Sequence, residues 1–160
     1  MTTAREQPWR DDGPEQGRIV MLTRNPISEA IETIAGAVGR TVVLIETDEN
    51  GEGLAGLEGA AVGVADAVVL CDHDAPDAPA VLRAALESPA SYVAMLASRN
   101  RTAMVLEELR GEGYVAAAFE RLHMPAGLNT GGKGPGEIAL SVVAEVVAVS
   151  YGRPGGAMRG

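Results

Sequence analysis

Uninterrupted apolar runs alternate along this chain with segments whose apolar residues recur at helical spacing. Arg18–Thr23 (RIVMLT), Thr41–Ile45 (TVVLI) and Ala67–Cys71 (AVVLC) are runs typical of parallel strands that are buried on both faces. Between the first two runs, apolar side chains recur at helical spacing from Ile27 to Val38, which predicts an amphipathic helix. A strand, a helix and a strand in this succession form the βαβ unit of a doubly wound sheet.

The second half of the chain continues this alternation. Helices are predicted over Ala80–Leu86, Thr102–Arg110, Tyr114–Leu122 and Glu137–Val149, a strand over Tyr92–Ala97, and a short last strand over His123–Leu128. Asp48–Gly63 is rich in glycine and is expected to be a loop with at most a short helix. The pattern therefore predicts an α/β fold, a three-layer Rossmann-like domain with a mostly parallel sheet.

The two ends of the chain differ in composition from the region between them. Met1–Gly17 is polar, with Trp9 as its one large apolar residue, and is predicted to be a disordered arm. Tyr151–Gly160 is rich in glycine and proline and is predicted to be a flexible tail. Residues 18–150 remain for one domain, which fits a chain of 160 residues.

Composition and charge then exclude several classes of protein. Aromatic residues make up only 3% of the chain, so the core is expected to consist of Ala, Val, Leu and Ile. The net charge of −9 disfavours nucleic acid and anionic membranes as partners. The single Cys71 excludes an internal disulfide, and residues 1–17 lack the apolar core of a secretory signal. A cytoplasmic location is therefore expected.

The clearest candidate for ligand chemistry is the turn after the Tyr92–Ala97 strand. Ser98, Arg99 and Arg101 lie where this strand gives way to a helix, and α/β proteins bind ligands at the carboxyl edge of the sheet. A helix start presents free N–H groups to an anion, and arginine adds charge-assisted hydrogen bonds. We therefore predict that these three residues hold a phosphate or another anionic group.

Two more segments are expected to line the same crevice. One is the turn after the first strand, where an asparagine can cap the following helix and Pro26 fits its first position. The other is the Gly-rich loop before the last helix, which Lys133 makes locally positive. The binding residues predicted from these segments are Asn25, Ser28, Gly127, Asn129 and Gly131.

Two nucleotide-binding motifs occur in incomplete form. Gly51–Gly56 spells GxGxxG, but that motif belongs between the first strand and the first helix, where Thr23–Ser28 has no glycine. Gly127–Gly134 resembles a P-loop, but Gly134 replaces the Ser or Thr that holds magnesium. Glu46 ends the second strand, where a ribose-binding acid would stand, and is expected to be a solvated carboxylate. These motifs do not predict a nucleotide-dependent enzyme.

Titratable residues occur at two further notable places. Cys71 precedes Asp72-His73-Asp74, and it is expected to be either a small buried apolar residue or a contact for a metal or its sulfur. Glu145 stands inside the apolar segment Glu137–Val149, where a carboxylate must be paired or lie at an edge. The apolar character of this helix indicates that it is buried or lies in a subunit interface, and a homodimer is expected.

From Ala67 to Val149, four motifs occur in the order found in the C-terminal Rossmann domain of the XdhC/CoxI family, which the chain resembles. Residues 67–77 (AVVLCDHDAPD) are similar to a strand that ends in a Thr/His/Asp-rich turn, and residues 92–101 (YVAMLASRNR) to a tyrosine strand that ends in Gly-Ser-Arg-Arg. Residues 125–131 (PAGLNTG) and 135–139 (PGEIA) are similar to the family's Pro-Ile-Gly-Leu-Asp-Ile-Gly loop and Pro-Glu-Glu-Ile-Ala helix. The turn at Thr23–Ile27 departs from the family, because it lacks a Gly-Ala-Gly-His sequence.

This resemblance implies an accessory protein for the maturation of a molybdenum hydroxylase of the xanthine or carbon monoxide dehydrogenase type. Such a chaperone binds molybdenum cofactor and delivers it, after sulfuration, to the apo-enzyme; Ser98, Arg99 and Arg101 would hold the phosphate of the cofactor. Two alternatives stay open. One is an NAD(P)-dependent oxidoreductase, and the other is a ligand-free module that dimerises or docks on an apo-enzyme through Glu137–Val149.

Overall fold

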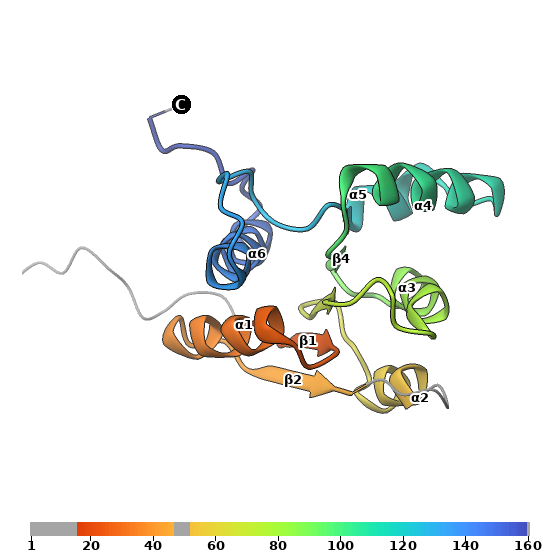
Figure 1. The fold of residues 1–160 in the computed structure, drawn as a ribbon, viewed down its shortest axis with the longest axis horizontal. Coiled ribbons are helices and arrows are strands. Elements are labelled where there is room, and N and C mark those ends of the chain that lie inside the picture. The colour runs from red at the N-terminus through yellow and green to blue at the C-terminus, as the bar shows by residue number, and fades with distance from the viewer. Residues whose placement is uncertain (1–15, 47–51, 160) are drawn as a thin grey trace, which may run out of the picture.

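A sheet of five parallel strands forms the centre of the structure, a computed structural model that describes residues 16–46 and 52–159 (Figure 1). The strands lie in the order β2-β1-β3-β4-β5. They are β1 (Ile19–Leu22), β2 (Val42–Ile45), β3 (Ala67–Leu70), β4 (Tyr92–Met95) and β5 (Leu122–His123). Every strand pairing within the described residues is parallel, so the predicted α/β fold is confirmed.

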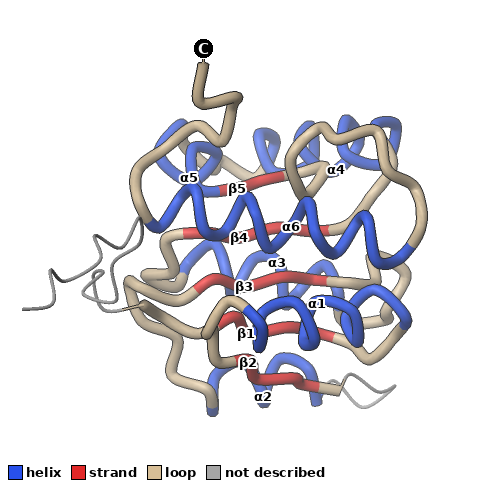
Figure 2. The backbone as a smooth tube through the Cα atoms, turned by 90° about the vertical axis from the view of Figure 1, so that its left-hand side faces the viewer, coloured by secondary structure: helices blue, strands red, loops and turns tan. Residues whose placement is uncertain are grey.

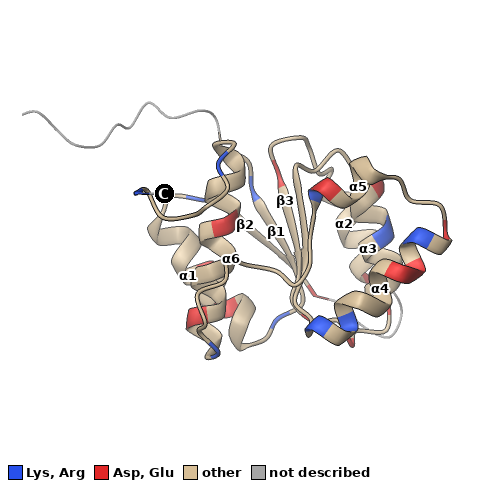
Figure 3. Ribbon diagram, turned by 90° about the horizontal axis from the view of Figure 1, so that it is seen from above, with Lys and Arg blue, Asp and Glu red and all other residues tan. Residues whose placement is uncertain are grey.

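Helices cover both faces of this sheet. They are α1 (Pro26–Ala37), α2 (Glu52–Gly59), α3 (Ala78–Glu87), α4 (Arg99–Gly111), α5 (Ala116–Arg121) and α6 (Pro135–Ser150). Helices α1 and α6 lie across one face, whereas α2, α3, α4 and α5 lie on the other (Figures 2 and 3). The arrangement has the three layers that the sequence predicts.

Side chains of the strands alternate between the two layers of helices. Ile19 and Met21 of β1 pack with residues of α1 and α6, whereas Val20 and Leu22 pack with residues of α2 and α3. Successive side chains of a strand point to opposite faces, so a strand covered on both sides must be apolar at every position. This requirement explains the uninterrupted apolar runs of the sequence.

Local side chains determine where α1 and α4 begin. The side chain of Asn25 accepts hydrogen bonds from the backbone N–H groups of Ile27 and Ser28, both at 2.9 Å, and Ser28 Oγ accepts one from the N–H of Asn25 at 2.8 Å. These contacts form a capping box, and Pro26 occupies the first turn as predicted. Ser98 caps α4 in a similar way, by accepting a hydrogen bond from the N–H of Arg101 at 3.1 Å.

Several predicted boundaries differ from those in the structure. The last strand was expected over residues 123–128, but β5 comprises only Leu122–His123. Pro125 follows closely and cannot donate a ladder hydrogen bond, which explains the early end of the strand. Helix α4 begins at Arg99 rather than Thr102, because Ser98 supplies its cap. The Gly-rich segment contains the short helix α2, as the sequence allowed.

The ends of the chain are described only in part. Most of the predicted arm, Trp9 included, lies outside the described residues, and so does Gly51 of the GxGxxG sequence. Gln16 Nε2 donates a hydrogen bond to Tyr151 Oη at 3.0 Å, which joins the start of the described chain to the end of α6. The segment after α6 lies close to the loop before α6: a Cβ at Gly155 would lie 2.8 Å from Leu128 Cδ2, so the absence of a side chain at Gly155 permits this close approach.

Candidate functional site

A cleft of about 1060 Å³ opens at the carboxyl ends of β1, β3 and β4. The neighbouring strands β1 and β3 send their following helices to opposite faces of the sheet, and such a switch point is where open α/β sheets bind ligands (Figure 3). The cleft is lined by Ile27, by residues 71–73, by residues 96–99, by the loop of residues 125–133, and by Ile138 and Ser141 of α6. The turn after β1, which was predicted to line this crevice, contributes Ile27, whereas Ile138 and Ser141 of α6 were not among the predicted residues.

The predicted anion-binding turn is divided between two places. Ser98 and Arg99 line the cleft, and both are exposed. Ser98 Oγ already accepts the hydrogen bond from Arg101 N, but its hydroxyl can still donate. Arg101 does not line the cleft; its Nη2 donates to Asp74 Oδ1 at 3.2 Å, and its side chain lies in a second cavity, between α3 and α4.

Asn25 and Ser28 do not line the cleft either. Oδ1 of the Asn25 side chain accepts hydrogen bonds from the N–H groups of Ile27 and Ser28 at the start of α1, and its Nδ2 donates to the carbonyl of Cys71 at 3.0 Å. Ser28 is buried in the capping box. Asn25 therefore occupies the amides that would bind a dinucleotide pyrophosphate in a glycine-rich first turn.

The loop of residues 125–133 carries the predicted Gly127, Asn129 and Gly131 into the cleft. Gly127 has a φ of +97°, and a Cβ there would lie 2.4 Å from Ser141 Oγ, so only glycine lets the loop approach α6 this closely. The N–H of Leu128 donates to the carbonyl of Ser141 at 3.1 Å. These contacts fix one wall of the cleft to the helix behind it.

Glu145 of α6 fastens the same loop to the sheet. Its Oε1 accepts a hydrogen bond from Tyr92 Oη at 2.5 Å and another from the N–H of Gly127 at 3.1 Å. Nδ1 of His123 lies 3.5 Å from the same oxygen, and the His123 ring stacks on Tyr92 with centroids 4.4 Å apart. The paired carboxylate that the sequence predicts in this helix is thus confirmed.

Opposing effects set the pKa values in this cluster. Burial alone would raise the pKa of Glu145, but the contacts from His123, Tyr92 and Gly127 outweigh it and lower the pKa below its usual value. Burial, together with the hydrogen bond to Glu145, raises the pKa of Tyr92 far above its usual value. At neutral pH the cluster therefore contains a carboxylate and a protonated phenol.

Cys71 lies in the wall of the cleft and is only 5% exposed. Burial, with a smaller effect from Asp72, raises the pKa of its thiol to about 12, so the thiol is neutral at physiological pH. Within the described residues, no three His, Cys, Asp or Glu side chains come together in a way that could hold a metal ion. The expected burial of Cys71 is confirmed, and its contact with a metal or sulfur stays a prediction.

Both signs of charge occur in the cleft. Arg99 and Lys133 supply positive charge, and Asp72 supplies a carboxylate whose Oδ1 accepts from the N–H of Asp74 at 2.9 Å. The chain has a net charge of −9, so a cleft with two basic side chains is a local exception to its mostly negative electrostatic potential. No helix in the described part of the chain is long and apolar enough to cross a membrane.

The remaining sequence motifs have structural explanations. Gly56, the last glycine of the GxGxxG sequence, lies in α2, and a Cβ there would approach Ile45 Cγ2 to 2.4 Å. This glycine therefore allows helix α2 to pack closely on β2. Glu46 pairs with Arg24, whose Nε donates to Oε1 at 2.9 Å, and both side chains are largely exposed.

Sequence comparison matches most of the chain to one family. The family model described as "XdhC Rossmann domain" matches residues 19–146, from the start of β1 into α6. The match begins well before Ala67, where the resemblance in the sequence motifs starts. It therefore includes the first βαβ unit, in spite of its altered turn.

Two known proteins extend this comparison. The uncharacterized protein YqeB of Escherichia coli (strain K12) is 41% identical over 73 residues, which are 46% of this chain and 14% of YqeB. A crystal structure described as a xanthine dehydrogenase from Bacillus halodurans superimposes with a TM-score of 0.71 at 22% identity. This superposition covers 86% of the present chain and 44% of the other, and it shows a shared fold. The matched regions thus span less than half the length of either protein.

Proposed function

The chain belongs to the XdhC Rossmann domain family, and on that premise we propose that it is a non-catalytic carrier of molybdenum cofactor. The carrier would serve the maturation of a molybdenum hydroxylase of the xanthine or carbon monoxide dehydrogenase type. The observation that carries this proposal is the cleft at the β1/β3 switch point, with its Gly-rich wall and its two basic side chains. Molybdenum cofactor is the cargo of this carrier.

The phosphate of the cargo would bind at the start of α4. There Ser98 and Arg99 line the cleft at the start of the helix; the Ser98 hydroxyl can donate a hydrogen bond, and Arg99 adds a full positive charge. A hydrogen bond between arginine and phosphate is charge-assisted and therefore stronger than a neutral one. Lys133, on the opposite wall, would add a second cation.

The pterin part of the cargo would lie along the loop of residues 125–133. Backbone groups of this loop offer hydrogen bonds to the ring edge, and Ile27, Leu96 and Ile138 offer apolar contact to its faces. The volume of about 1060 Å³ is sufficient for a cofactor of this size. Cys71, in the same wall, would contact the metal or its sulfur; burial keeps its thiol protonated, so only coordination of the metal as a thiolate would release a proton.

A carrier role is supported by the chemistry of the cleft. The cleft contains two residues that could act as a base, Asp72 and His73. Among the described residues that line the cleft, no nucleophile is hydrogen-bonded to either of them. The His123–Glu145 pair is used beneath the loop, where it holds the backbone of Gly127. The cleft therefore offers binding and orientation rather than proton transfer or nucleophilic attack.

The partner would be an apo molybdenum hydroxylase. Membership of the XdhC Rossmann domain family supports this class of partner. A homodimer remains part of the proposal. Of the large apolar side chains of α6, Leu140 is the exposed one, so it is the first position to change in a test of self-association.

Equilibrium binding of purified protein to molybdenum cofactor, NAD and NADP tests the proposal. We expect the molybdenum cofactor to bind, and Arg99→Ala to weaken it at least tenfold, since a hydrogen bond to a charged group contributes about 1.5–3 kcal/mol. Arg24→Ala is the matched control, because Arg24 is an exposed arginine near the same sheet edge that pairs with Glu46 and does not line the cleft. It should leave the affinity unchanged.

Three results would overturn the proposal. Binding of NAD or NADP without binding of molybdenum cofactor would indicate an oxidoreductase-like domain. Absence of any binding would leave a docking or dimerisation module. Equal losses in the Arg99 and Arg24 variants would show that the contact is nonspecific charge attraction outside the cleft.

A further inference from the structure

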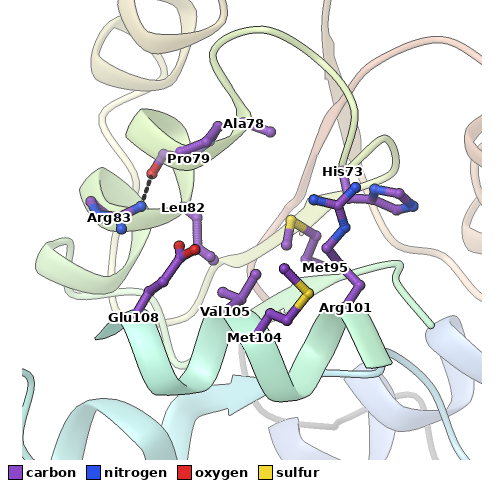
Figure 4. A pocket seen from close by; sticks show the side chains of 10 residues that line it. All are labelled: His73, Ala78, Pro79, Leu82, Arg83, Met95, Arg101, Met104, Val105 and Glu108. Carbon is purple, nitrogen blue, oxygen red and sulfur yellow. Dashed lines mark hydrogen bonds between the residues drawn. The ribbon is translucent and has the colours of Figure 1, made fainter. Parts of the chain in front are cut away.

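A second cavity lies between α3 and α4, on the face of the sheet away from α6 (Figure 4). Its volume is about 170 Å³. The apolar side chains around it are Leu82 of α3, Met95 of β4, and Met104 and Val105 of α4. In Figure 4 these side chains converge on the space between the two helices. Met104 is 60% exposed, so much of its side chain is accessible to a ligand from the surface.

One end of this second cavity carries two basic side chains. Arg101 and His73 lie beside each other there (Figure 4). Arg101 donates through Nη2 to Asp74, and its other nitrogen atoms have no hydrogen bond within the described residues. Nδ1 of His73 is buried and lies 3.1 Å from Asp74 Oδ1, but without the alignment of a hydrogen bond. A buried nitrogen without a partner is costly, so a ligand that supplied one would be favoured.

The opposite end has a different electrostatic character. Arg83 is already occupied, since it pairs with Glu112 and donates to the carbonyl of Pro79 at 2.9 Å. Glu108, which also lines the cavity, carries a negative charge about 10 Å along α4 from Arg101. A ligand with a negative charge at each end would be repelled there. The charges therefore favour a ligand with one anionic end and an apolar body.

We propose that this second cavity binds a small organic carboxylate. Its carboxylate would lie against Arg101 and His73, and its apolar body of about six carbon atoms would lie among Met95, Met104 and Leu82. An engineered apolar cavity of roughly 150 Å³ accommodates benzene, so a cavity of this size suits a body of that kind. Methionine is flexible and adapts to different apolar shapes, which suits a site that binds carboxylates with different apolar bodies.

This site is separate from the cofactor cleft but touches it at one residue. His73 lines both cavities, whereas Arg99 lines only the cleft and Arg101 only the second cavity. Substitution of one arginine at a time therefore allows binding at each site to be tested without changing the other site. The proposal does not depend on the cofactor-carrier function.

Calorimetric titration with hexanoate, 1-hexanol and hexylammonium tests the proposal. We expect hexanoate to bind at least tenfold more tightly than either of the other two, which have the same apolar chain with a neutral or cationic end. Arg101→Ala should weaken hexanoate binding at least tenfold, and Arg99→Ala, the matched control, should leave it unchanged. Circular dichroism of both variants verifies that the fold is retained.

A second variant gives an effect in the opposite direction. Asp74 is exposed and competes with the ligand for Arg101, so Asp74→Asn should increase the affinity for hexanoate about threefold or more. Damage to the fold cannot produce such a gain. The proposal is refuted if hexanoate does not bind to the natural chain, if it binds no better than 1-hexanol, or if Arg99→Ala removes binding as fully as Arg101→Ala does.

Discussion

The hydrogen bond between Tyr92 and Glu145 should be a main determinant of stability, and it can be removed from either side. Tyr92→Phe deletes one hydroxyl from a residue that is 1% exposed, and its ring can stay stacked on His123. Glu145→Gln keeps the size of the side chain but removes its charge. Each single change, and the two together, form a double-mutant cycle that isolates the energy of the pair.

The expected magnitudes follow from what each change leaves unpaired. Tyr92→Phe removes one charge-assisted bond but leaves Glu145 paired with Gly127 and close to His123, so a loss of about 1.5–3 kcal/mol is expected. Glu145→Gln weakens the contacts to Tyr92, Gly127 and His123 together, so a loss of about 2–4 kcal/mol is expected. Glu145→Gln reduces this bond to a neutral one, and Tyr92→Phe deletes it. The two changes therefore act on the same bond, and the double variant should lose less than the sum by about 1 kcal/mol.

Urea unfolding at neutral pH, followed by circular dichroism, measures these free energies. A pH series adds an independent test, since the folded state lowers the pKa of Glu145. A lowered pKa means that the carboxylate stabilises the fold above its unfolded pKa of about 4.3, and that this contribution disappears as the pH falls through the lower folded value. The difference between the natural chain and Glu145→Gln should therefore shrink in acid. Additive losses within about 0.5 kcal/mol would refute the reasoning, because they would show that the two side chains do not interact.

Three further predictions concern other contacts in the fold. Burial would raise the pKa of Asp66, but hydrogen bonds from Arg18 and Gly63 outweigh it and lower the pKa to about 2. The ionised Asp66 should therefore contribute about 2 kcal/mol to the free energy of unfolding, and urea unfolding should show this contribution being lost between about pH 4 and pH 2. Asp66→Asn should remove that acid-dependent loss. Arg121 donates hydrogen bonds to the carbonyls of Leu86, Ser88 and Ala90 at the end of α3. Arg121→Lys should lower the free energy of unfolding by about 1–3 kcal/mol, because one ammonium cannot reproduce the hydrogen bonds of the planar guanidinium. A loss under about 0.5 kcal/mol would contradict this role. Gly127→Ala should shift the loop of residues 125–133 and weaken cofactor binding, whereas Gly136→Ala, where a Cβ meets nothing, should not; equal affinities in the two variants would show that the loop tolerates the Cβ.

The strands and their layers could be predicted from the sequence because burial on both faces leaves a direct signature. A parallel strand between two layers of helices must be apolar at each position, and the runs at Ile19–Leu22 and Ala67–Leu70 show this. The cap at Asn25 was predictable for a similar reason, since asparagine before Pro26 is a local signal. The length of β5 was not predictable in this way, because a strand of two residues has no period.

The cleft at the carboxyl edge of the sheet was predictable in position, but only some of the residues that line it were. The carboxyl edge of a parallel sheet is fixed by topology, so Ser98, Arg99 and the Gly-rich loop could be assigned to it. Asn25 was predicted both as a helix cap and as a ligand contact, but its side-chain Oδ1 already accepts the two hydrogen bonds of the first role. Ser141 gave a signal that the sequence analysis did not use. It is a small polar residue in an apolar helix, and it marks the place where Gly127 approaches.

The separation of Arg99 from Arg101 follows from the early start of α4. In a strand, side chains two residues apart point to the same face, so an extended turn would place both arginines in one site. In a helix, two residues correspond to a rotation of about 200°, so the side chains point in nearly opposite directions. Ser98 caps the helix immediately before Arg99 and thus places both arginines in its first turn. A single cap therefore determines that Arg99 lines the cleft at the β1/β3 switch point and that Arg101 lines the second cavity.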